Sequence, residues 1–364
     1  MTPPPIPLPD PLPLPMSPGS LKMLLLGTFA LHLMAVNLGV GGSLIMAMHA
    51  LRGRPQDREL VRRFAPLLPP AVTFAITLGI APLLFVQLTY GPFFYSASVL
   101  TAIPWLALIF LLMAGYTLLY HFVGATSSGQ RHAASGILGA LLLLSVGLML
   151  VNVTTLSLRP DLWVAHAAAS PNGLRMNTAD PTLWPRYLHM VAGIVAVAGL
   201  LLAGWGARRE YAYARRAGLG WFIGATTSQA IWGTWLLLSQ PKPLLDLLLN
   251  GTSSASLSLW ISTALGLLAL FMALPASQDG APARAVWPPF GLGLGSALGM
   301  ILLRDQARDA SLAAFGFHPG ALPHRTDWLS LGVFGLTFLG LAVLLIVLLR
   351  WAMQPPVGTG TEAP

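Results

Sequence analysis

The residues best suited to carry chemistry are histidines placed inside long apolar runs. His32 lies in LLLGTFALHLMAVNLGVGG, and His189 lies in WPRYLHMVAGIVAVAGLLLAG, while His49 and His121 lie near the far ends of their own runs. A neutral imidazole in water-free surroundings keeps one donor and one acceptor to satisfy. Haem iron can satisfy the acceptor, and a neighbouring Ser, Thr or backbone carbonyl is the alternative partner. These histidines are therefore candidate haem ligands, with structural hydrogen bonding as the competing interpretation.

Other redox and metal chemistry is excluded by composition. The chain has no Cys, which rules out disulfides, thiolate metal sites, Cys-ligated iron–sulfur clusters and covalent c-type haem within this chain. Asp and Glu are nearly absent from the apolar runs. That argues against a proton-driven pump or transporter with a carboxylate relay, and against a di-metal carboxylate site. No catalytic residue is assigned.

The elements that must position these histidines follow from composition. Of 364 residues, 55% are hydrophobic and only 9% charged, and the mean hydropathy is +0.70. A soluble domain carries about a quarter charged residues, so a soluble enzyme is excluded and a polytopic membrane protein is indicated. The net charge of +8 does not predict nucleic-acid binding, because the basic residues sit in short loops between apolar runs.

The apolar runs predict an all-α transmembrane bundle of about nine helices. Each run is long enough to cross roughly 30 Å of hydrocarbon, and the eighth is short and Gly-rich. The predicted spans are 23–50, 69–91, 99–121, 135–155, 187–206, 219–239, 255–275, 287–303 and 328–352. The transmembrane domain covers 21–352, flanked by a Pro-rich disordered arm over 1–20 and a flexible tail over 353–364.

The distribution of Lys and Arg predicts the N-terminus outside and the C-terminus inside. The first inner loop carries five Arg, against one Lys in the segment before it, and this early asymmetry usually dominates orientation. With that orientation, His32 lies about 14 Å below the outer surface, and His189 lies near the same surface. Two long outer connections, 155–186 and 304–327, could bind an outward partner or simply be solvated.

The small residues that follow the two outer histidines have two interpretations. Gly39, Gly41 and Gly42 come after His32, and Ala192 and Gly193 come after His189. Small side chains allow a flat macrocycle to come close, and they equally allow a neighbouring helix to pack closely. Spacing alone does not distinguish the two.

The order of these features resembles subunit I of the cytochrome bd quinol oxidase superfamily. FALHLMAVNLGVGGSLIMAMHAL looks like the family's first helix, which would make His32 a haem ligand. PRYLHMVAGIVAVAGLLLAGWG looks like the start of the fifth helix, which would make His189 the ligand of the low-spin haem b. The resemblance is good over 23–125 and 183–210, and it implies a multi-pass protein of the bacterial inner membrane.

The departures from that family concern oxygen chemistry. The family's third helix carries glutamates, and VLTAIPWLALIFLLMAGYTLLYH has none. Near the end of the eighth helix, where the family has a Glu followed by an Arg, SALGMILLRDQAR offers Met300 and Arg304. The long quinol-binding loop between helices six and seven is reduced to 240–254. The resemblance therefore implies a relative that keeps b-type haem without oxygen reduction.

We accordingly expect a membrane b-type cytochrome subunit with one or two haems b. It would exchange electrons between a quinol or quinone and a separate redox chain, such as a multihaem c-type cytochrome or an iron–sulfur protein. Met300 would lie near the His32 haem, and Arg304 would pair with a propionate. His49 and His121 could hold a second haem near the inner surface. The alternatives are a haem-free membrane anchor and, less favoured, a transporter with helices broken at Pro82 and Pro104.

A quinone site is only weakly indicated. Gln229 and Trp232 lie in ATTSQAIWGTWLLLSQP within the sixth run. A buried Gln could hydrogen-bond a quinone carbonyl, and a Trp could stack on its ring. Hydrogen bonding of these polar groups between helices is the competing interpretation.

Overall fold

The protein is described by a computed structural model that places residues 13–127 and 133–352. The remaining parts of the predicted N-terminal arm and tail, and Arg131 of an inner loop, lie outside the described residues. The arm prediction needs correction at its end, because Pro18 already begins the first helix and Ser17 caps it. Leu14 is buried, and its backbone hydrogen-bonds to Pro323 and Arg325.

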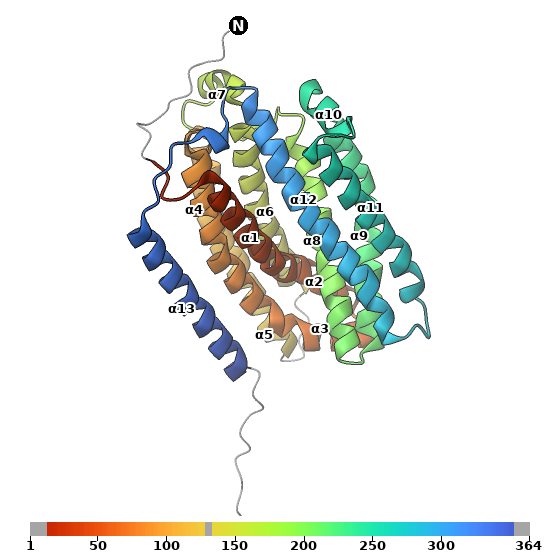
Figure 1. Ribbon diagram of the computed structural model, residues 1–364. Coiled ribbons are helices and arrows are strands. Elements are labelled where there is room, and N and C mark those ends of the chain that lie inside the picture. The colour runs from red at the N-terminus through yellow and green to blue at the C-terminus, as the bar shows by residue number, and fades with distance from the viewer. Residues whose placement is uncertain (1–12, 128–132, 353–364) are drawn as a thin grey trace, which may run out of the picture.

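The chain is an all-helical bundle, and no strand occurs in the part of the chain that the structure describes (Figure 1). Its helices are α1 (Pro18–Val36), α2 (Gly42–Arg52), α3 (Pro55–Phe64), α4 (Leu68–Leu100), α5 (Ala102–Ser127), α6 (Ala133–Ser157), α7 (Trp163–Ala169), α8 (Leu183–Arg208), α9 (Ala212–Leu238), α10 (Lys242–Leu249), α11 (Ser254–Ala276), α12 (Trp287–Ala313) and α13 (Trp328–Ala352).

Seven segments of the described chain are long and apolar enough to cross a membrane. The first segment joins α1 and α2, and the second joins α3 and α4. The other five correspond to α5, α6, α8, α11 and α12. Each of the nine predicted runs coincides with a long helix, but α9 and α13 are not among the seven. Helix α9 contains the polar stretch GATTSQ, which lowers its hydropathy.

Short elements mark the two ends of the bundle. In Figure 1, α7 and α10 lie at the end where α1 begins, and α3 lies at the opposite end. We call these the α1-start end and the α3 end; by the predicted orientation they are outer and inner. Helix α3 was not predicted, because its Arg-rich sequence is read as a loop by hydropathy. Helix α10 was likewise predicted only as a link.

Close backbone approach holds the centre of the bundle together. Along the α8–α9 contact, a Cβ placed on Gly199 would lie 2.6 Å from the Gly218 carbonyl oxygen. A Cβ on Gly41, in the π-helical turn Asn37–Gly41 between α1 and α2, would lie 2.6 Å from the Ile194 carbonyl. Neighbouring helices thus fill the space beside Gly41, which supports the helix-packing interpretation of the glycines after His32.

Two proline positions and the eighth run differ from expectation. Helix α4 continues through Pro82, and Pro104 lies in the first turn of α5, so neither breaks a span. Helix α4 instead changes direction at Tyr90, two residues before Pro92.

Helix α12 continues to Ala313, well beyond the predicted 303, because ion pairs compensate the charges in its last turns. The second outer connection is therefore shortened to 314–327.

Helix α13 lies apart from the other helices in Figure 1. Most of its side chains are exposed, with Trp328 at 80% and Leu336 at 74%. Phe334 makes an edge-on ring contact with Phe85 of α4. Exposed apolar side chains on a membrane helix suit contact with lipid.

Candidate functional site

His32 is held by α4 in an orientation suited to a metal ligand. Its Nδ1 lies 2.8 Å from the Ala75 carbonyl oxygen. Because a carbonyl can only accept, Nδ1 must carry the proton and Nε2 keeps its lone pair. No hydrogen-bond donor to Nε2 is found within 13–127 and 133–352. Metal-binding histidines usually donate their second ring N–H to a carbonyl or carboxylate in this way.

A glycine makes this contact possible. Gly79 lies one turn after Ala75 on α4, and a Cβ there would come within 2.9 Å of the His32 Cε1. A larger residue would push the imidazole away from the Ala75 carbonyl. The sequence reveals the histidine, but the carbonyl and the glycine that orient it come from a helix 43 residues away.

His189 on α8 repeats this arrangement against α9. A Cβ on Gly233 would lie 3.1 Å from both Cε1 and Nδ1 of His189. The Gln229 backbone, one turn before that glycine, is the group that interacts with the imidazole. The His189 Nδ1 is buried, but its contact falls outside hydrogen-bond geometry. Both histidines therefore face a glycine of a neighbouring helix, Gly79 of α4 for His32 and Gly233 of α9 for His189.

A cluster of charges ties α1, α4 and α12 together at the α1-start end. The Lys22 Nζ lies 2.8 Å from an Asp305 carboxylate oxygen and also contacts Asp309. Arg308 pairs with Asp305, and its guanidinium lies 3.8 Å from the centre of the Tyr90 ring. The Tyr90 hydroxyl donates to Asp309 at 2.7 Å. We call these five residues the outer charge cluster; sequence patterning did not identify them as a unit.

Arginines connect this cluster to the two histidines. The Arg304 guanidinium lies 4.6 Å from the centre of the Phe29 ring, and that ring is 6.2 Å from the His32 ring. Arg186 precedes His189 by three residues, and it lies near enough to Arg304 for the two positive charges to repel each other. The buried Nε atoms of Arg186 and Arg308 have no hydrogen-bond partner in the described chain. Arg308 is already paired with Asp305, so the unpartnered Nε of Arg186 is the donor that favours an anionic group at this place.

The histidines and arginines are two of the kinds of group that a haem needs around it. His32 presents an Nε2 that can coordinate iron, and the arginines present donors that can take carboxylates such as propionates. The described residues contain no group of three or more His, Asp or Glu able to hold a metal ion, but haem iron needs only one or two protein ligands. Met300 lies one turn before Arg304 on α12 and is half-buried, so its ligand role remains a prediction.

The two inner histidines differ from the outer ones. His49 is 1% exposed; its Nδ1 lies 2.5 Å from Asp57, and Trp221 donates its Nε1–H to His49 Nε2 at 3.1 Å. With both ring nitrogens in hydrogen bonds, His49 could bind iron only after Trp221 moved. His121 lies exposed on α5. A second haem between them remains a prediction, and the geometry of His49 does not support it.

Of the two predicted quinone residues, Gln229 lies close to the part of α8 that carries His189. Gly193 lies one turn after His189 on α8. A Cβ placed on Gly193 would be 3.1 Å from the side-chain amide nitrogen of Gln229. The Trp232 ring centre is 6.1 Å from that of Trp235. Their role in binding a quinone remains a prediction.

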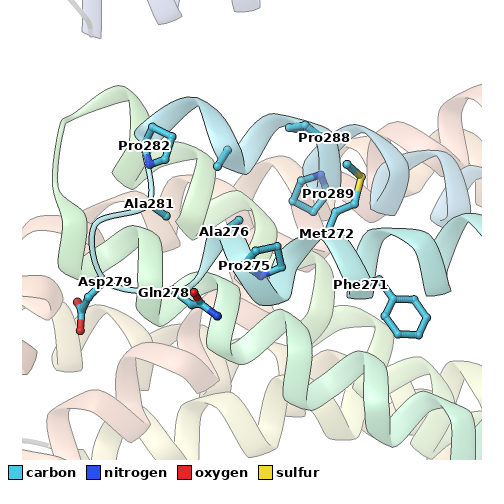
Figure 2. Close-up of a pocket in the computed structure, with 11 residues that line it drawn as sticks. Phe271, Met272, Pro275, Ala276, Gln278, Asp279, Ala281, Pro282, Pro288 and Pro289 are labelled. Carbon is cyan, nitrogen blue, oxygen red and sulfur yellow. The ribbon is translucent and has the colours of Figure 1, made fainter.

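Two cavities that are open to the surface lie elsewhere in the described part of the molecule. One, of about 540 Å³, lies between the end of α11 and the start of α12, where prolines and Met272 surround it (Figure 2). Asp279 is its only charged residue and pairs with Arg216. The other, of about 560 Å³, includes His49 and Arg52. Neither cavity is lined by His32 or His189.

Comparison with known proteins supports the fold. No protein-family model matches the chain, and no curated protein matches it in sequence. Among solved structures, it is similar to a chain of the bd oxidase from Geobacillus thermodenitrificans, with a TM-score of 0.65 and 14% identity, over 94% of this chain and 100% of that one. The resemblance seen in the sequence is thus confirmed at the level of the fold.

Proposed function

We propose that this chain is a b-type cytochrome subunit of a respiratory complex in the bacterial inner membrane. It would exchange electrons between a quinol or quinone and a separate outward-facing redox protein. The observation that carries the proposal is the His32 geometry, in which Nδ1 is fixed by Ala75 and Nε2 is left to bind iron. The fold shared with a bd oxidase chain supports it.

The residues of this chain would hold the haem as follows. His32 and His189 would each supply an imidazole to a haem b, and Met300 would be a candidate second ligand at the His32 haem. Arg304 and Arg186 would pair with propionates, because the buried Arg186 Nε has no other partner in the described chain. The haem iron would supply the one-electron chemistry that the side chains lack.

The quinone would bind near His189. Gln229 can donate an amide hydrogen to a carbonyl, and Trp232 offers an aromatic face. The placement of the Gln229 amide one turn from His189 supports this site. The redox partner, a multihaem c-type cytochrome or an iron–sulfur protein, would dock on the predicted connections 155–186 and 304–327, whose parts between the long helices are 158–182 and 314–327. The exposed Val164 and Leu174 on the first of these segments support such a contact.

Oxygen reduction is not part of the proposed function. Reducing oxygen to water consumes protons that must reach a buried site. Helix α5 contains no Asp or Glu along its whole length, so it offers no carboxylate to carry them.

Quinol-driven reduction of the purified chain tests the proposal. Addition of a short-chain quinol should reduce the haem b, seen optically, without oxygen uptake at an oxidase rate. His32→Ala should abolish part of this signal, whereas His318→Ala, at an exposed loop histidine, should leave it unchanged. Oxygen uptake that disappears with His32→Ala would restore an oxidase assignment. Purified protein without haem would favour the alternative of a membrane anchor.

A further inference from the structure

A cavity at the α3 end is built from the polar end of α2 and the first half of α9. Its volume is about 560 Å³. The polar side chains around it are those of His49, Arg52, Gln56, Tyr213, Arg216 and Trp221. Two of these are cations, and none is an acid. The site lies where the Arg-rich loop meets the membrane-spanning helices, so both water and lipid can reach it.

The wall of this cavity is fixed by a chain of hydrogen bonds. Asp57, fully buried, accepts from His49 Nδ1 at 2.5 Å and also from the Tyr213 hydroxyl. His49 Nε2 in turn accepts the Trp221 Nε1–H at 3.1 Å. The Arg52 guanidinium lies 5.7 Å from the centre of the Trp221 ring. Because each group holds the next, the aromatic wall and the cation at its rim are positioned before any ligand arrives.

The cations at the rim are only partly compensated. Asp57 interacts electrostatically with Arg52, but it is buried and accepts hydrogen bonds from His49 and Tyr213. Arg216 pairs with Asp279, whose side chain is 87% exposed. A solvent-exposed ion pair contributes little and exchanges readily. An anion in the cavity would therefore meet two guanidinium groups, Arg52 and Arg216.

The floor of the cavity continues along α9 as a smooth surface. Gly220 and Gly224 line it, and a Cβ at either position would meet nothing within 4 Å. From Tyr213 to Gly224 the helix rises about 16 Å. The site thus has a cationic end near Arg52 and Arg216 and an open apolar end along α9.

We infer that this cavity binds an anionic phospholipid, with its phosphate between Arg52 and Arg216 and an acyl chain along Gly220 and Gly224. Basic pockets between transmembrane helices commonly take such headgroups. A free phosphate would satisfy the cations but would leave the glycine surface uncovered. The inference needs only the membrane bundle, so it stands apart from the proposed haem chemistry.

Lipid binding by the full-length chain tests the inference. The delipidated protein is titrated with phosphatidylglycerol, phosphatidylcholine or inorganic phosphate, and bound lipid is counted by native mass spectrometry. Phosphatidylglycerol should bind about tenfold more tightly than phosphatidylcholine. Arg52→Gln should weaken it roughly fivefold, since one cation near a membrane surface contributes about that factor. Gly224→Leu, which fills the apolar end, should weaken it by a similar factor.

A matched variant separates this site from general surface charge. Arg54→Gln removes the same charge from the same loop but lies outside the cavity, so it should bind phosphatidylglycerol like the unaltered chain. Equal losses in Arg52→Gln and Arg54→Gln would overturn the inference. So would inorganic phosphate displacing the lipid while Gly224→Leu has no effect. Gly224→Leu keeps both cations, so it gives a result even if Arg52→Gln fails to fold.

Discussion

The two ends of the bundle use histidine in opposite ways. At the α1-start end, the His32 Nδ1–H donates a hydrogen bond to the Ala75 backbone carbonyl, and Nε2 stays available. At the α3 end, His49 lies between Asp57 and Trp221 with both nitrogens in hydrogen bonds. Both residues are histidines within long apolar runs of the sequence, so the surrounding hydrogen bonds separate a candidate ligand from a structural residue.

The largest expected effect is a contrast between the two histidines: replacing one should change the haem content, and replacing the other should change the unfolding temperature. His32→Ala should lower the haem count, because it removes one of the two proposed imidazole ligands. His49→Ala should keep the haem but unfold at lower temperature, because it leaves Asp57 and Trp221 without their partner. Haem per protein by pyridine haemochrome and thermal unfolding in detergent measure the two outcomes. Loss of haem only in His49→Ala would reverse the assignment of the two ends.

Asp57→Asn tests the inner network from its centre. The carboxylate is fully buried and accepts from His49 and Tyr213. Replacing a buried, engaged charge costs about 3 kcal/mol of stability. We expect a lower unfolding temperature with an unchanged haem count. An unfolding temperature equal to that of the unaltered chain would show that the network is not structural.

A single methyl group should weaken the outer site. Gly79→Ala places a Cβ 2.9 Å from the His32 Cε1, so the imidazole must leave the Ala75 carbonyl. Loss of such a supporting contact lowers metal-site affinity about 10- to 100-fold. Haem retention against a competing apo-haemoprotein measures this loss. Gly27→Ala on α1, where a Cβ meets nothing within 4 Å, is the matched control and should retain haem normally.

The smallest effect should come from the outer charge cluster. Tyr90→Phe removes the 2.7 Å hydrogen bond to Asp309, while Lys22 still compensates that carboxylate. A hydrogen bond to a charged group contributes about 1.5–3 kcal/mol, and the remaining cation should keep the loss at the lower end. Thermal unfolding should show a small decrease. A decrease as large as that of Asp57→Asn would mean that the two ends are equally dependent on single contacts.

The sequence predicted the long elements better than the site. Each predicted apolar run coincides with a long helix, because burial in lipid imposes length and hydropathy on every span. The short amphipathic α3 and α10 and the last turns of α12 were missed, because their polar residues resemble loops until their partners are known. Lys22, 287 residues before Asp309, is one such partner.

Site residues were identified by type but not by environment. The histidines stood out because an ionisable group in an apolar run needs a reason. The groups that decide their roles, Ala75 for His32 and Trp221 for His49, come from other helices and carry no local signal. Asp57 had a signal that could have been used: it is the only Asp in the Arg-rich loop that follows His49.

The reduced-minus-oxidised optical spectrum of the purified chain tests the central claim most directly. The account predicts absorption bands of haem b after dithionite reduction, with a lower haem count in His32→Ala and an unchanged count in His49→Ala. A spectrum without haem bands in protein produced with ample haem would contradict the claim that the outer histidines are ligands.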